Sequence, residues 1–151
     1  MLELAIPADR EAVNEIAKQV HAQHVAWRPD IYEMVEELYP EERFLDAIKA
    51  RTLYVAKLAD TVVGYTLLKR RACDWPGLVK RKIMVVEEFG VHESCRGQGI
   101  GKEMMEDVHA LARAYGCTDL ELNVYPQNDD AVGFYQKCGF TIKTIGMQRK
   151  V

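Results

Sequence analysis

The chain has 151 residues, of which 48% are hydrophobic and 28% charged, a composition typical of a globular domain with its own core. Twenty Lys and Arg residues against 23 Asp and Glu residues give a formal charge of −3, which does not favour general binding to nucleic acid. The sequence has no run of 18 apolar residues and no secretory signal, so we expect no membrane association. We expect one cytoplasmic domain over residues 1–151.

The four cysteines are spread along the sequence and form no C-x-x-C pair. A structural zinc site needs clustered thiolate or imidazole ligands, and a disulfide framework is typical of smaller secreted domains. We therefore expect reduced thiols and no metal.

The first fifty residues predict a strand followed by helices. Alternating apolar residues indicate a short strand before Pro7, and Asp9 can cap a helix over residues 10–26. We expect a second helical stretch around Ile31–Leu38 and a third helix beginning at Pro40. The inner face of that third helix is predicted to carry Phe44, Leu45 and Ile48.

From residue 52 the pattern changes to strands. Thr52–Leu58 and Val62–Lys69 are predicted to form a hairpin, and a turn at Trp75–Gly77 leads into a long strand over Lys80–Val91. Strict alternation along that strand places its side chains on two faces. One face is predicted to carry Val85, Glu87, Phe89 and Val91, and the other Val86, Glu88 and Gly90.

The last third of the sequence alternates between helix and strand. A glycine-rich turn at Gly97–Gly101 precedes an amphipathic helix that runs to about Tyr115. A strand over Leu120–Val124, a short helix over Asp129–Lys137 and a last strand from Phe140 follow. Together these elements predict an α/β fold with a mixed sheet.

The segment Cys95–Lys102 carries the clearest chemical signal. Its three glycines let a ligand approach the main chain, and the helix that follows offers unpaired N–H groups with partial positive charge. The turn is not a Walker A loop, because Arg96 replaces its first glycine and Glu103 its Ser or Thr, nor a dinucleotide fingerprint. A phosphate site is indicated; a tight turn without a ligand is the alternative.

The pattern R-x-x-G-x-G, formed by Arg96, Gly99 and Gly101, resembles the acetyl-CoA loop of the GNAT superfamily of N-acetyltransferases. A second block, Asn128–Phe140, resembles the N-x-x-A-x-x-F-Y-x-x-x-G-F element of the same family. The resemblance implies a central, mostly antiparallel sheet with a splayed strand pair, flanked by helices. It also implies acetyl transfer from acetyl-CoA to a primary amine by direct attack, without a metal.

The resemblance implies roles for named residues. Tyr135 would donate a proton to the departing thiolate, and either Glu87 or Glu88 would accept the proton of the amine, with Glu87 preferred. Trp27 and Tyr32, with Glu87, would contact the acceptor, and His24 lies in the same region. The residues expected to bind acetyl-CoA are Phe89, Val91, Arg96, Gly97, Gln98, Gly99, Gly101, Lys102, Asn128 and Tyr135.

The expected acceptor is a small-molecule or peptide amine that carries positive charge, because carboxylates lie in the middle of the central strand. Two alternatives remain open at this point. The domain could bind acyl-CoA as a sensor or docking module without turnover, or it could use ATP at the phosphate loop. The oligomeric state is also open, with a homodimer as one alternative.

Overall fold

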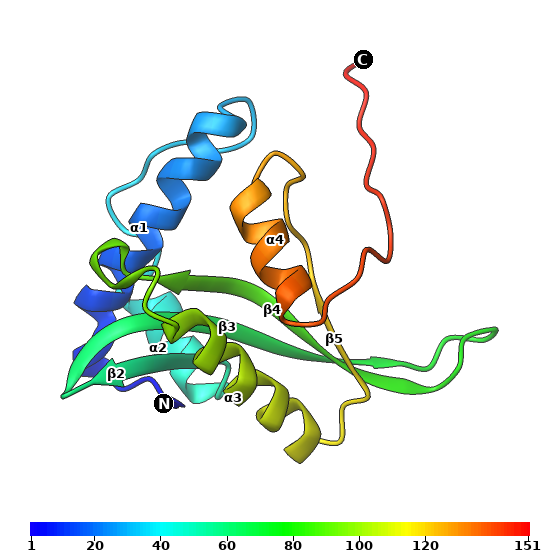
Figure 1. Ribbon diagram of the computed structural model, residues 1–151, viewed down its shortest axis with the longest axis horizontal. Coiled ribbons are helices and arrows are strands. Elements are labelled where there is room, and N and C mark those ends of the chain that lie inside the picture. The colour runs from blue at the N-terminus through cyan, green and yellow to red at the C-terminus, as the bar shows by residue number, and fades with distance from the viewer.

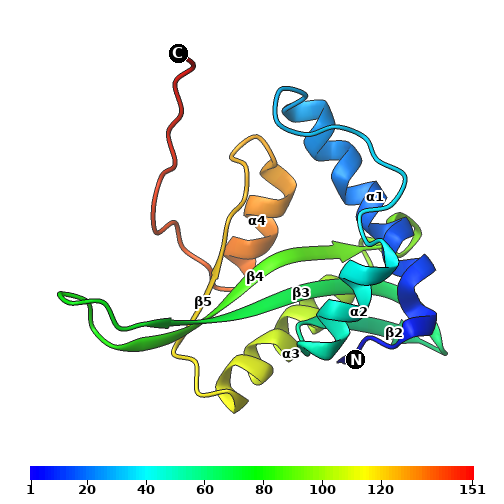
Figure 2. The same ribbon diagram turned by 180° about the vertical axis from the view of Figure 1, so that it is seen from behind.

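A five-stranded sheet with helices on both faces forms the fold in the computed structural model, which describes residues 1–151 (Figures 1 and 2). The strands are β1 (Leu2–Leu4), β2 (Leu53–Leu58), β3 (Thr61–Cys73), β4 (Arg81–Val91) and β5 (Asp119–Leu122). The helices are α1 (Arg10–Trp27), α2 (Glu41–Lys49), α3 (Ile100–Ala114) and α4 (Asp129–Lys137). The predicted mixed α/β class is confirmed. No helix combines the length and apolar character needed to cross a bilayer.

The strands follow the chain in the order β1-β2-β3-β4-β5, and every neighbouring pair is antiparallel except the last. β4 and β5 run parallel, which requires a crossover connection, and α3 provides it. They pair only along Ile83–Val86 and Asp119–Leu122, after which β5 ends while β4 continues to Val91. The predicted splayed strand pair is therefore confirmed, and it consists of β4 and the edge strand β5.

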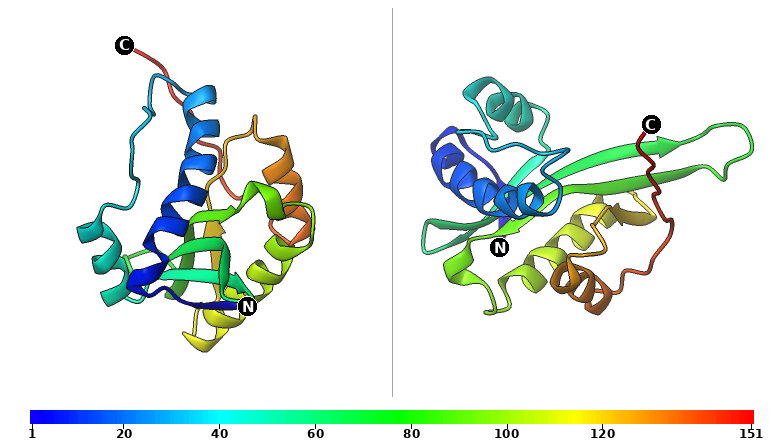
Figure 3. Two further views of the ribbon diagram at one scale, coloured as in Figure 1. Left: turned by 90° about the vertical axis from the view of Figure 1, so that its left-hand side faces the viewer. Right: turned by 90° about the horizontal axis from the view of Figure 1, so that it is seen from above.

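The helices cover the two faces of the sheet in pairs (Figure 3). α1 and α2 lie on one face, and α3 and α4 lie on the other. The core beneath α1 and α2 consists of Ala5, Val13, Ile16, Ala17, Tyr39, Phe44, Leu53, Val55, Tyr65 and Leu67. The core beneath α3 and α4 consists of Tyr54, Leu68, Met84, Val86, Met105, Val108 and Ala112.

A β-bulge interrupts the alternation of β4. Leu68 pairs with Val86 and Leu67 pairs with Glu88, so Glu87 is an extra residue with no partner on β3. Val86 packs beneath α3, whereas Glu88 lies on the opposite face with Leu67. The predicted shared face of Val86 and Glu88 is therefore wrong, because one inserted residue reverses the side-chain direction.

Two further predictions about elements are wrong. Residues Ile31–Leu38 form a non-helical connection between α1 and α2, lying between Pro29 and Pro40 and carrying three glutamates. No strand forms after Phe140, because the segment that follows has no neighbour in the sheet.

The predicted inner face of α2 is only partly correct. Phe44 is fully buried and Ile48 half-buried, one helical turn apart, but Leu45 is 43% exposed. Each helical step rotates by about 100°, which turns Leu45 away from the core.

We expect Gly90→Val to destabilise the fold, because α1 crosses β4 at this glycine. A Cβ there would lie 3.0 Å from both Tyr65 and Val20 and 3.1 Å from Ile16, all in the interface between helix and sheet. Overpacking of this kind costs about 1–3 kcal/mol, measurable as a lower free energy of unfolding in urea. Gly133→Ala is the control, since no atom lies within 4 Å of its added Cβ. Equal stability of the two variants would contradict the described packing.

Candidate active site

The loop between β4 and α3 presents a row of unpaired main-chain amides. Gly97 and Gly99 adopt positive φ angles of 76° and 84°, conformations that side chains other than glycine rarely take. As a result, the amides from Gly97 to Lys102 donate to no oxygen of the chain. Arg96 fixes the start of the loop, because its Nε donates to the main-chain oxygen of Val91 at 3.0 Å. The geometry is that of an anion site at a helix N-terminus.

Helix α4 packs beside this loop and brings the second sequence block to it. A Cβ on Gly101 would lie 3.3 Å from the ring of Phe134, so glycine permits the close approach of α3 to α4. The ring of Phe89 on β4 lies 5.9 Å from that of Phe134 and 6.3 Å from that of Tyr135, centroid to centroid. The structure therefore brings the loop, β4 and Tyr135 together.

Asn128, at the start of α4, has a structural task. Its side-chain oxygen accepts a hydrogen bond of 3.2 Å from the main-chain amide of Ala131 and so caps the helix. The side-chain NH₂ group of Asn128 makes no hydrogen bond within the chain and is available to a ligand.

Tyr135 lies in an apolar environment formed by Phe89, Phe134 and Phe140. Burial, with a smaller contribution from Cys138, raises the pKa of the Tyr135 phenol to about 12. The phenol therefore stays protonated near neutral pH and can donate a hydrogen bond or a proton.

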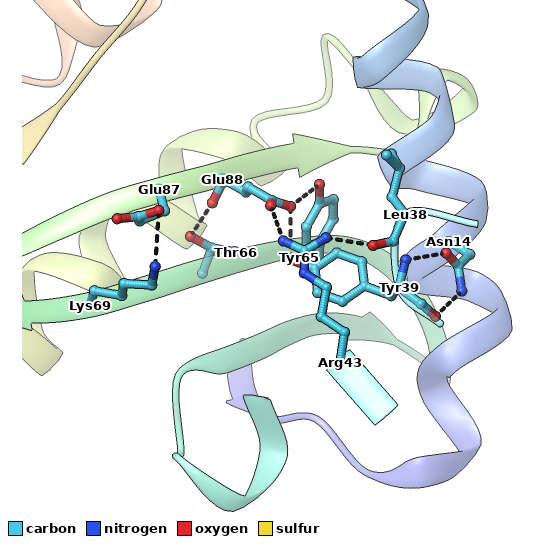
Figure 4. A network of polar contacts seen from close by, with 9 residues as sticks. All are labelled: Asn14, Leu38, Tyr39, Arg43, Tyr65, Thr66, Lys69, Glu87 and Glu88. Carbon is cyan, nitrogen blue, oxygen red and sulfur yellow. Dashed lines mark hydrogen bonds and ion pairs between the residues drawn. The ribbon is translucent and has the colours of Figure 1, made fainter. Parts of the chain in front are cut away.

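Glu88 is held by three donors on the face that α1 and α2 cover (Figure 4). Its carboxylate accepts hydrogen bonds from the hydroxyls of Tyr39 and Tyr65, at 2.8 and 3.0 Å, and from Arg43 at 2.8 Å. Burial and the charge of Glu88 raise the pKa of both phenols, which keeps them as donors. The Arg43 guanidinium also lies 4.1 Å from the ring centroid of Tyr39. Glu88 thus fastens α2 and the preceding connection to β4.

Glu87 has a different environment from its neighbour. The bulge leaves its side chain 39% exposed, with one ion pair of 3.3 Å to Lys69 (Figure 4). Lys69 borders a surface depression together with Tyr39 and Arg43, so Glu87 reaches the same side of the sheet as Glu88. The predicted shared face of Glu87 and Phe89 is also wrong, because Phe89 packs against α4. Of the two carboxylates, Glu87 is the more exposed, with 39% of its side chain exposed against 29% for Glu88.

An aromatic cluster connects the end of α1 to the segment after β5. His24 stacks on Tyr32 with 5.2 Å between ring centroids, and Trp27 contacts His24 at 5.9 Å. The hydroxyls of Tyr32 and Tyr125 are hydrogen-bonded at 2.9 Å. The expected acceptor residues Trp27 and Tyr32 thus belong to one aromatic cluster. Glu87, the third expected acceptor residue, contacts Lys69 and not this cluster.

Sequence reasoning missed four members of these two groups: Tyr39, Arg43, Tyr65 and Tyr125. Tyr65 follows the apolar alternation of its strand, so nothing in the sequence separates it from a core residue. Tyr125 offered a usable signal, because it lies three residues after the end of β5, in the stretch where the splayed strands part.

The two histidines of α1 serve different partners. His21 Nε2 lies 2.6 Å from the main-chain oxygen of Glu33. Burial, and to a lesser extent His21, lowers the pKa of His24, against an opposing effect of Glu88, so the His24 imidazole is neutral at physiological pH.

No group of three or more His, Cys, Asp or Glu side chains is arranged to hold a metal ion.

Comparison with known proteins is consistent with this arrangement. A sequence model described as the Acetyltransferase (GNAT) family matches residues 18–140. The peptidyl-lysine N-acetyltransferase YjaB of Salmonella typhimurium is 33% identical over 117 residues, covering 78% of this chain and 63% of that protein. YjaB of Escherichia coli is 29% identical over 116 residues, covering 77% and 61%. The chain thus spans less than two thirds of the length of these two relatives.

Solved structures show the same fold. A mutant of the BH1408 protein of Bacillus halodurans superposes with a TM-score of 0.94 at 26% identity, covering 100% of this chain and 99% of that one. The aminoglycoside N-acetyltransferase AAC(6')-Iy, crystallised with CoA, superposes with a TM-score of 0.66 at 15% identity, covering 100% and 99%. That second likeness concerns the fold alone. Since the match covers residues 18–140, about four fifths of its length, and includes both sequence blocks, the chain belongs to the GNAT family of acetyltransferases.

Proposed function

We propose that this protein transfers the acetyl group of acetyl-CoA to a positively charged primary amine. The observation that carries the proposal is the row of unpaired amides from Gly97 to Lys102, which lies beside the unpaired stretch of β4 and near Tyr135. Membership of the acetyltransferase family supports the same reaction class. Acetyl-CoA, when bound, supplies the activated thioester.

The residues around the loop would hold the cofactor along its length. The amides of Gly97–Lys102 would bind the diphosphate, helped by the positive charges of Arg96 and Lys102. The main chain of Phe89–Val91, which has no neighbour on the β5 side, would pair with the amide groups of the pantetheine arm as an added strand would. Asn128 would donate its free NH₂ group to the same arm.

Two side chains would move protons during the transfer. Tyr135 would donate to the thiolate that departs, because its phenol is protonated and lies next to β4. Glu87 would accept the proton of the incoming amine, directly or through a water molecule. We assign this role to Glu87 because the carboxylate of Glu88 is already engaged by three donors.

The acceptor would approach from the face of the sheet that carries the carboxylates of Glu87 and Glu88 and the aromatic cluster. Glu87 and Glu88 would attract a cationic amine, and the faces of Trp27 and Tyr32 would contact its charged and apolar parts. The YjaB relatives act on peptidyl-lysine, which supports a lysine side chain of a peptide as one acceptor. A small polyamine has the same chemistry.

A thiol-release assay tests the reaction itself. The full chain is mixed with acetyl-CoA and, in turn, with lysine-containing peptides, polyamines and aminoglycosides, while free thiol is followed spectroscopically. For at least one of these classes of amine, we expect more thiol release than in the background reaction that contains no amine. Calorimetric binding of CoA without thiol release from any amine would instead favour an acyl-CoA sensor.

Gly99→Val should weaken CoA binding at least about tenfold, which corresponds to about 1.4 kcal/mol. A β-branched residue at φ = 84° strains the loop, and its side chain would occupy the space that the diphosphate approaches. Calorimetry with CoA measures the effect. Gly77→Val is the matched control, since Gly77 has a similar φ of 89° but lies in the distant β3–β4 turn. Equal affinity of the two variants for CoA would contradict the assignment of the loop to the CoA site.

Tyr135→Phe should lower kcat about 100-fold while the dissociation constant of CoA stays within a few-fold of the original. The substitution keeps the aromatic packing and removes only the proton donor. Because the protonated form acts and the pKa of Tyr135 is raised to about 12, its contribution is present at neutral pH and lost only as the pH rises through about 12. A variant that kept the full kcat would contradict the role of Tyr135 as the proton donor.

Glu87→Gln should lower kcat/KM by about 100-fold or more, because a carboxamide cannot accept the proton. Its unfolding free energy should change little, since the side chain is exposed. Glu88→Gln provides the contrast: it should lower stability through the weakened contacts to Tyr39 and Tyr65 while kcat/KM stays within a few-fold of the original. A large loss of kcat/KM in Glu88→Gln alone would reverse the two roles.

A further inference from the structure

A single serine, Ser94, lies just after β4, and the proposed acetyl transfer does not use it. Ser94 belongs to a short 3₁₀ helix, Glu93–Cys95, and is exposed at the surface. No other serine occurs in the chain. A serine hydroxyl becomes a nucleophile where an adjacent base accepts its proton, so the hydrogen-bond partners of Ser94 determine what it can do.

The side chain of Ser94 is hydrogen-bonded to His92, two residues before it. The Oγ atom of Ser94 lies 2.8 Å from Nδ1 of His92, and the main-chain amide of Ser94 donates to the same nitrogen at 3.2 Å. Because an amide can only donate, Nδ1 carries no proton and is the acceptor. The hydroxyl of Ser94 therefore donates to Nδ1, which is the contact that a histidine needs in order to act as a base toward a serine.

A carboxylate lies on the opposite side of the same imidazole ring. In this tautomer Nε2 of His92 carries the proton, and it lies 3.1 Å from Oε1 of Glu15 on α1. One helical turn later, the side chain of Gln19 accepts a hydrogen bond of 2.9 Å from the amide of Glu93. The amide of His92 donates to the oxygen of Val63 on β3 at 2.8 Å. Helix α1 and strand β3 thus fix the position of the imidazole.

We propose that Ser94 and His92 form a second catalytic site, in which Glu15 positions the imidazole and which hydrolyses small acyl esters through an acyl-serine. The sequence of nucleophile, base and carboxylate, with distances of 2.8 and 3.1 Å, is that of a serine-hydrolase triad. The two ring nitrogens exchange their usual places, but each keeps the role that the chemistry requires. The unpaired amides of Gly97–Lys102 begin three residues after Ser94 and are donors for the oxyanion.

The hydrolysis takes two steps, and the same nitrogen carries the proton in both. First, Oγ of Ser94 attacks the carbonyl carbon of the ester while Nδ1 of His92 takes the hydroxyl proton; the bond between carbon and the alcohol oxygen breaks, and the alcohol leaves with that proton. Next, a water molecule gives a proton to Nδ1 and attacks the acyl-serine. The bond to Oγ breaks, Ser94 recovers the proton from His92, and a carboxylic acid is released. The carboxylate of Glu15 stabilises the imidazolium between the transfers.

A fluorophosphonate probe and para-nitrophenyl acetate test the proposal on the full chain without CoA. We expect one covalent adduct per chain, located at Ser94 by mass spectrometry. Ester hydrolysis should fall at least about tenfold in Ser94→Ala and in His92→Ala, and both variants should lose the adduct. Glu15→Gln should lower kcat about tenfold and leave KM unchanged, because Glu15 acts only through His92. Far-UV circular dichroism verifies that each variant is folded.

Two control variants separate this site from ordinary surface reactivity. His109→Ala removes an exposed histidine of α3 that is not hydrogen-bonded to the serine, and Cys95→Ala removes the thiol whose Sγ lies 3.6 Å from Oγ of Ser94. Both variants should keep the adduct, and their hydrolysis rate should stay within a few-fold of the original.

The proposal is overturned by the absence of an adduct at Ser94, or by hydrolysis that persists unchanged in Ser94→Ala. Loss of hydrolysis in Cys95→Ala would also overturn it, since the thiol would then be the nucleophile. None of these measurements uses acetyl-CoA or an amine, so their failure would leave the proposed acetyl transfer unaffected.

Discussion

The architecture of the site depends on one mismatch, the greater length of β4 relative to its parallel neighbour β5. Pairing ends at Val86 and Leu122, so the main chain of Glu87–Val91 has no strand on one side. Main-chain donors and acceptors in the middle of a sheet need partners, and water or a ligand must supply them here. The bulge at Glu87 lies at the point where pairing stops, and the amide-rich loop begins soon after β4 ends. The unpaired stretch of β4 therefore continues directly into the amide-rich loop between β4 and α3.

The same difference in length connects the two groups of residues that the proposed reaction needs, which lie on opposite faces of the sheet. The loop and Tyr135 lie with α3 and α4, and the carboxylates of Glu87 and Glu88 lie with α1 and α2. A sheet with complete pairing would isolate these groups from each other. In the proposed reaction, the opening between β4 and β5 would let a thioester held on one side meet an amine held on the other, and such positioning can supply much of the rate of a direct transfer.

Local sequence signals predicted the helices around the site well. The predictions that failed were those of strand features that depend on pairing with residues far away in the sequence. The bounds of α4 follow from its cap at Asn128 and the glycine at residue 139, both of which act over one turn. The bulge in β4 has no comparable signal, because it depends on which residues of β3 pair with it. The stretch after Phe140 has the composition of a strand, but a strand requires a neighbour, and the composition of one segment cannot show whether the chain supplies one.

The glycine-rich loop differs from the other glycine turns of this chain in how its main-chain amides are paired. Gly116 ends α3, and its amide donates to the oxygen of Arg113. Gly139 ends α4 in the same way, with a hydrogen bond to Gln136. Glycines that only terminate a helix thus pair their amides within the chain. The amides from Gly97 to Lys102 remain unpaired in succession, and this supports the proposal that they bind a diphosphate.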